Sequence, residues 1–193
     1  MPNSPACAPH CPTQATRRSP PPRARRPRNS TRCARHYPQC PASLLELLGK
    51  PDGTYWRDYG STTINLLAPG SDVYEYPYDL LSAEQMLEEG AKYRDSIADI
   101  YGGDANDDGE LVDRRIDIAL SMNRRLCFSH CMNNGGTSLL YIDFEPAPGG
   151  MVGQVVRFLH DPDSYAVIAD DFDGYLRKLI DDGCAFVIDF DEE

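Results

Sequence analysis

Residues 137–180 constrain the fold most, because their pattern passes from strand to turn to strand and then to helix. Over residues 138–144, three purely apolar side chains alternate with a second set that includes Tyr141 and Asp143. This period of two is typical of a β-strand with one buried face. We expect that face to carry Leu140, Ile142 and Phe144. Residues 145–150 read Glu-Pro-Ala-Pro-Gly-Gly and predict a turn, since proline fixes φ and glycine accepts positive φ. Residues 153–158 then predict the return strand of a hairpin.

The same stretch continues into a third strand and a helix. After a turn at residues 160–163, the apolar run at residues 165–169 predicts the strand. Asp170 is the expected N-cap of the helix, and Gly183 is the expected end. Apolar residues recur at helical spacing, so one face should pack against the sheet. They are Phe172, Tyr175, Leu176, Leu179 and Ile180.

Upstream segments add further elements. Residues 42–48 predict a short helix, and the β-branched run at residues 62–68 predicts a strand. Ser-Ala-Glu-Gln at residues 82–85 matches a capping box and predicts a helix through about Asp95. Residues 186–190 predict a final edge strand. Hairpins combined with helices indicate a single α+β domain, in which a largely antiparallel sheet packs with helices.

Charge divides the chain into two unequal parts. Residues 1–40 contain eight arginines and no acidic residue, which gives this segment a charge of +8. Since the net charge of the whole chain is −11, residues 41–193 carry a charge of −19. The first part also holds nine of the sixteen prolines and, Tyr37 apart, hardly any large apolar side chain. Such a composition cannot bury enough apolar surface to fold, so we predict a disordered, basic tail at residues 1–40 and a folded domain at residues 41–193.

The composition also bears on location and partners. An acidic surface disfavours nucleic-acid binding, which needs Lys and Arg to displace counterions, and favours solubility or a basic protein partner. No apolar stretch has the length of a signal peptide or a membrane span. Seven cysteines without framework spacing suit reduced thiols. We therefore expect a cytoplasmic protein that binds neither nucleic acid nor membrane.

Two motifs resemble metal sites, but each lacks part of the ligand set. Residues 104–109 imitate the first half of a calcium loop, yet its twelfth position, where calcium needs a carboxylate, is Arg115. Cys7 with Cys11, and Cys33 with His36 and Cys40, offer zinc ligands at irregular spacing. We expect no metal and no cofactor.

Cysteine, histidine and acidic residues offer other possibilities. Cys127 or Cys131 with His130 or His160 could form a nucleophile and base, although nothing in the sequence brings them together. Four acids are expected along one rim, namely Asp143, Glu145, Asp161 and Asp163. With the tyrosines Tyr74, Tyr76 and Tyr78, this rim is either a solvated face or the contact surface for a basic protein. We expect no catalytic residue.

The residues 139–163, LLYIDFEPAPGGMVGQVVRFLHDPD, followed by VIADDFDGYLRKLI at residues 167–180, resemble the SUKH superfamily. That group includes the yeast cell-wall-synthesis regulator and many bacterial immunity proteins. Its pattern of an apolar strand, an acid, Pro, a Gly-rich turn, Gly-Gln-Val and a Phe/Leu helix implies structural roles for several positions. These are Pro146, Gly149, Gly150, Gly153, Gln154, Phe172 and Leu176.

The resemblance extends over about residues 41–182, with further likeness at residues 41–48, 76–82 and 115–128. Two departures stand out. The opening helix of the family is not apparent, and its usual Trp-Ile-Pro-Phe is represented by Leu-Cys-Phe-Ser at residues 126–129.

The resemblance implies a non-enzymatic protein-binding domain. Its most concrete form is an immunity protein that neutralises a bacterial toxin, for example a basic nuclease. A regulatory scaffold of the cell-wall-assembly type is the alternative within binding, and a small hydrolase is the alternative from another class. The partner and the oligomeric state are not specified by the sequence.

Overall fold

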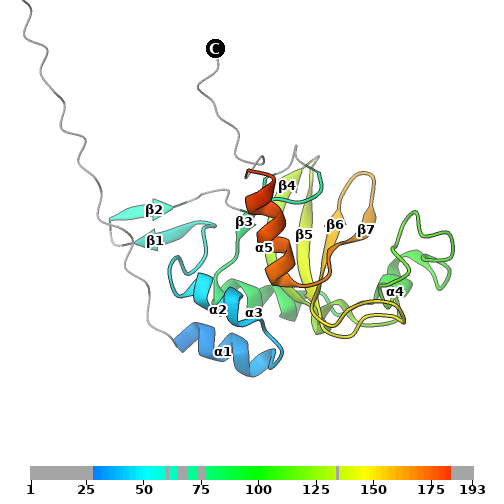
Figure 1. The fold of residues 1–193 in the computed structure, drawn as a ribbon, viewed down its shortest axis with the longest axis horizontal. Helices are drawn as coiled ribbons and strands as arrows, with labels where there is room; N and C mark the ends of the chain where they lie inside the picture. Colours follow the sequence, from blue (N-terminus) through cyan, green and yellow to red (C-terminus); the bar gives the residue numbers. More distant parts are fainter. Residues whose placement is uncertain (1–27, 60, 65–68, 74–76, 134, 184–193) are drawn as a thin grey trace, which may run out of the picture.

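The computed structural model describes residues 28–59, 61–64, 69–73, 77–133 and 135–183. Its centre is a five-stranded antiparallel sheet in the order β3-β4-β5-β6-β7, and β1 and β2 form a separate two-stranded sheet (Figure 1). The strands are β1 (Arg57–Tyr59), β2 (Thr62–Ile64), β3 (Asp79–Leu80), β4 (Leu126–Asn133), β5 (Gly136–Asp143), β6 (Gln154–Leu159) and β7 (Ser164–Ala169). The helices are α1 (Arg28–His36), α2 (Ala42–Leu48), α3 (Ala83–Lys92), α4 (Ile97–Tyr101), α5 (Phe172–Asp181) and the 3₁₀ turn η1 (Met122–Arg124). The predicted α+β fold with a largely antiparallel sheet is confirmed.

The predicted hairpin and the helix after it are present. β5 pairs with β6 from Leu139 opposite Phe158 to Asp143 opposite Gln154. α5 begins one residue later than predicted, because Asp171 is the N-cap and its side chain accepts a hydrogen bond from the Gly174 amide at 2.6 Å.

β5 is buried on both faces, whereas the sequence predicted only one. Six consecutive residues of β5, from Ser138 to Asp143, are buried. Phe128 of the neighbouring strand β4 packs edge-to-face against Phe172 of α5 with ring centroids 5.3 Å apart. α3 also contacts β4. Since side chains alternate between the two faces of a strand, both sets of β5 side chains are therefore buried.

The N-terminal boundary of the domain is also corrected. Residues 28–36 form α1, and Cys33 and Tyr37 are buried in the main core. α1 lies against α3, where Gly90 permits the approach, since a Cβ there would lie 2.5 Å from the Tyr37 hydroxyl. The composition of residues 1–40 did not predict this helix, because the segment is poor in apolar residues. Cys33 and Tyr37 are enough to pack α1 on the domain, since α3 supplies the other side of the contact. Residues 1–27 lie outside the described residues.

Several local predictions are confirmed. α2 has the predicted bounds, and Ser82 and Gln85 form the expected capping box, with Gln85 N donating to Ser82 Oγ at 3.2 Å. α3 ends at Lys92, three residues before the predicted end near Asp95. Of the strand predicted at residues 62–68, the structure describes β2, and the predicted strand at residues 186–190 lies outside the described part. In the part of the chain described, no helix combines the length and apolar character needed to cross a membrane.

Candidate functional site

The turn between β5 and β6 is held by the side chain of Gln154. Its Nε2 donates to the Arg115 carbonyl at 3.1 Å and to Asp143 Oδ2 at 3.2 Å, while its Oε1 accepts from the Met151 amide at 3.1 Å. Gly150 packs closely, since a Cβ there would lie 2.6 Å from Pro146 Cβ and 2.7 Å from the Arg115 carbonyl oxygen. The turn is therefore fixed by contacts within the domain.

The other residues to which the family resemblance gave structural roles lie in the same turn or on α5. Gly149 and Gly153 both have a φ of 93°, in the region that favours glycine. Phe172 is buried on α5, and Leu176 is half-buried beside it.

Asp143 cannot meet a partner, contrary to the prediction that placed it on an exposed rim. Its side chain has no exposed surface and lies 3.4 Å from Nε of the equally buried Arg125. Arg125 Nε makes no hydrogen bond in the described part, and the guanidinium instead donates to the carbonyls of Leu120 at 3.3 Å and Asp117 at 2.7 Å. Asp143 balances this buried charge, so its contribution is to the fold.

The four predicted acids also do not form one rim. Asp143 and Glu145 lie at one end of the hairpin, and Asp161 and Asp163 follow the other end of β6. β6 has 6 residues, which separates the two ends by about 20 Å. Glu145 is exposed and pairs with Arg124, with Nε 2.9 Å from Oε1.

The tyrosines expected beside the rim do not support it either. Tyr78 is completely buried, so its predicted exposure is wrong. Tyr74 and Tyr76 lie outside the described residues.

Asp161 and Asp163 instead adjoin a second group of acids. The Tyr101 hydroxyl at the end of α4 donates to Asp163, and His160 Nδ1 lies 3.3 Å from Asp163 Oδ1. The Tyr165 amide of β7 donates to the Leu111 carbonyl at 2.7 Å, so the loop after α4 runs beside β7 (Figure 1). We call this group the acidic edge. It consists of Asp104, Asp107, Asp108, Glu110, Asp161 and Asp163, all exposed except the half-buried Asp163.

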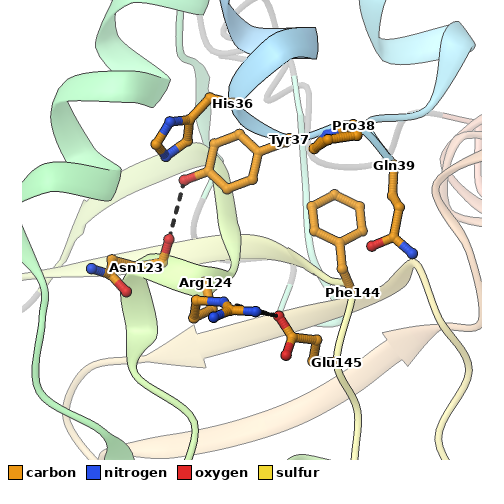
Figure 2. Close-up of a pocket in the computed structure, with 8 residues that line it drawn as sticks. All are labelled: His36, Tyr37, Pro38, Gln39, Asn123, Arg124, Phe144 and Glu145. Carbon is orange, nitrogen blue, oxygen red and sulfur yellow. Dashed lines mark hydrogen bonds and ion pairs between the residues drawn. The ribbon is translucent and has the colours of Figure 1, made fainter.

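A groove lies at the other end of the hairpin, between the α1–α2 connection and the end of β5. Its volume is about 260 Å³. Figure 2 shows Tyr37 and Phe144 between this connection and the Arg124–Glu145 pair. The two rings are 6.0 Å apart, and the Tyr37 hydroxyl donates to the Asn123 carbonyl at 3.3 Å. The lining residues are His36, Tyr37, Pro38, Gln39, Asn123, Arg124, Phe144 and Glu145.

Sequence reasoning missed this groove because it missed α1. The one available signal was Tyr37, a large aromatic residue in a segment otherwise poor in apolar side chains.

The cysteines considered as nucleophiles are in unfavourable surroundings for that role. Burial raises the pKa of Cys127, and it raises the pKa of Cys131 to about 11. Both thiols are therefore protonated near neutral pH, whereas the thiolate is the reactive form. Burial also lowers the pKa of His130, whose ring meets Tyr55 edge-on at 4.2 Å.

The candidate metal ligands in the described part of the chain do not form a complete ligand set. Within the described ranges, no three His, Cys, Asp or Glu side chains are grouped closely enough to hold a metal ion. Cys33 and Cys40 are free thiols, while Cys7 and Cys11 lie outside those ranges.

Comparison with known families assigns the chain. Residues 39–178 match the sequence model of the SMI1/KNR4 family, SUKH-1. The matched residues contain the whole central sheet, the Gln154 turn and the acidic edge, and α1 precedes them. A search of curated proteins returned no match. Because the family match covers well over half of its residues, the chain belongs to the SMI1/KNR4 family (SUKH-1).

Proposed function

We propose that this chain is a non-enzymatic binding protein of the cytoplasm, and most concretely an immunity protein that neutralises a basic toxin such as a nuclease. The observation that carries the proposal is the SUKH-1 match over residues 39–178. Proteins of this family typically bind protein partners in immunity or regulation. The charge of −19 on residues 41–193 supports a basic partner, because opposite charges favour the encounter and exclude acidic competitors.

The acidic edge is the proposed contact surface for this partner. Its loop is tied to the sheet by the contact of Tyr101 with Asp163 and by the hydrogen bond from Tyr165 to Leu111. A surface held in place in this way loses little conformational entropy on binding. Asp107 and Asp108 are exposed, as is Asp161 on the β6–β7 turn. This edge replaces the rim that the sequence had predicted.

The test starts by capturing the partner with the tagged full-length chain and by co-expressing the chain with toxin genes adjacent to its own. We expect a basic protein to co-purify and the chain to protect cells from it. The D107N/D161N variant should bind that protein roughly tenfold more weakly. The matched control is E84Q/E88Q, which removes the same charge from exposed positions of α3 and should bind normally.

The alternatives give different results. Capture of a non-toxic cellular protein, without protection, would replace immunity with the regulatory role. Hydrolytic turnover that is lost in a folded C127A variant would contradict a pure binding function. Equal weakening in both charge variants would show that net charge, and not the acidic edge, drives binding.

A further inference from the structure

The exposed side of α1 is basic although the domain it covers is strongly acidic. Arg32 and Arg35 are exposed and, with His36 and the half-buried Leu87 of α3, line a hollow of about 380 Å³. This hollow shares His36 with the groove beside Tyr37 and Phe144. Because His36 lines both hollows, they are neighbours, and we call them together the basic groove.

The charges in the first hollow are not used within the described part of the fold. No carboxylate there forms an ion pair with Arg32 or Arg35, whereas Arg124, Arg125 and Arg157 are each paired. Arg35 and His36 lie in the last turn of α1, where cations favour the helix dipole, and this effect alone would account for them. Arg32 lies before that turn, so the dipole does not account for its position.

The second hollow provides an apolar floor that is already in place. Tyr37 is fixed by its hydrogen bond to the Asn123 carbonyl and packs near Phe144. Both rings are largely buried, yet they border the groove (Figure 2). An aromatic floor next to exposed guanidinium groups suits a ligand with an apolar side chain followed by carboxylates.

We propose that the basic groove binds an acidic segment of a protein partner in extended form. Carboxylates of the segment pair with Arg32 and Arg35, and one aromatic side chain lies against Tyr37 and Phe144. A long polyanion such as RNA fits less well, because it would extend beyond Arg32 and Arg35 over a domain whose charge of −19 repels it, whereas a short acidic segment can lie within the groove.

This surface is separate from the acidic edge in both position and charge. α1 and α4 lie apart in Figure 1, and α1 precedes the residues that match the family. The proposal therefore does not depend on the immunity function.

The probe is a short fluorescein-labelled peptide that alternates glutamate with alanine and carries a single phenylalanine. Its binding to the full chain is measured by fluorescence anisotropy at low salt. We expect saturable binding that weakens when lysine replaces glutamate or when alanine replaces phenylalanine. R32E/R35E should weaken binding roughly tenfold or more. The control R177E/K178E makes the same charge change at exposed positions of α5 and should bind within about twofold of wild type.

Two further measurements make the result decisive. Circular dichroism must show that R32E/R35E is folded, and hydrogen exchange of the wild-type chain should slow in residues 28–40 when the peptide is added. Unchanged binding in R32E/R35E, equal loss in both charge variants, or tighter binding of a labelled oligouridylate than of the peptide would overturn the proposal.

Discussion

At the scale of single residues, the core contains polar groups whose partners come from distant parts of the chain. Arg125 is fully buried, with Asp143 opposite its guanidinium and the carbonyls of Asp117 and Leu120 as acceptors. Gln154 completes the cluster through Asp143 and the Arg115 carbonyl. Burying charges is costly unless they are paired and hydrogen-bonded, so each member depends on the others. The sequence alone shows an acid at the end of a strand, which is why Asp143 was predicted on the surface.

Asp79 is a buried acid without such a complete set of partners. Its Oδ1 has no hydrogen-bond partner in the described part, and burial raises its pKa from 3.8 to about 6. The folded state therefore holds this proton up to about pH 6, while the unfolded chain releases it near pH 4. The contribution of Asp79 to the free energy of unfolding should fall as pH rises through this window and remain low above it.

D79N should remove this penalty. We expect the variant to be more stable than wild type by about 1–3 kcal/mol above pH 6, with a difference that shrinks towards pH 4. Urea unfolding of both proteins across this range measures the difference. The exposed substitution E84Q serves as the control and should give no such trend. Parallel stability curves for wild type and D79N would mean that Asp79 titrates normally in the fold.

At the scale of elements, signals contained within a few residues were read correctly. The capping box of α3 needs only Ser82 and Gln85, and the β5–β6 hairpin needs only alternation and a Pro/Gly turn. α1 was not predicted, because its packing depends on α3, which lies more than fifty residues later in the chain. The acidic edge was not predicted for the same reason, since its loop is brought to Asp163 by Tyr101 and by the pairing of residues 111–113 with Tyr165.

α1 gives a direct test of the revised domain boundary. Deleting residues 1–40 removes Tyr37 and Cys33 from the core, and should lower the free energy of unfolding by about 3–5 kcal/mol. Deleting residues 1–27 should leave it unchanged, in line with their Pro- and Arg-rich composition. Thermal unfolding of the two truncated chains compares them. Equal melting temperatures for both would show that α1 does not contribute to the core.

α5 offers a matched pair of substitutions on one helix. Phe172 is 1% exposed and packs on Phe128, whereas Ile180, predicted on the same apolar face, is 70% exposed. F172A should cost about 3–5 kcal/mol, because it leaves a cavity between helix and sheet. I180A should cost less than about 0.5 kcal/mol, as is usual for surface positions. Denaturant unfolding distinguishes them, and similar losses would mean that Ile180 also packs against the sheet.

At the scale of the whole molecule, the sign of the surface charge changes along the chain. The acidic edge lies beside β7, whereas Arg32 and Arg35 of α1 line the basic groove. α1 precedes the residues that match the family, and it lies apart from β7 in Figure 1. Net charge alone pointed to a basic partner, but it could not reveal two surfaces of opposite sign. Their separation required the sheet order and the positions of α1 and α4.

The last prediction concerns the rate at which the captured basic partner associates. If the acidic edge steers the encounter, the association rate constant of the wild-type chain should fall steeply as salt is raised, because the Debye length shortens to about 8 Å near 0.15 M. The dissociation rate constant should change much less. D107N/D161N should associate more slowly at low salt and should depend less on salt than E84Q/E88Q does. Stopped-flow measurements at several salt concentrations give these slopes. Equal slopes for the two variants would assign the steering to the net charge of −11 as a whole and would remove the acidic edge from the encounter.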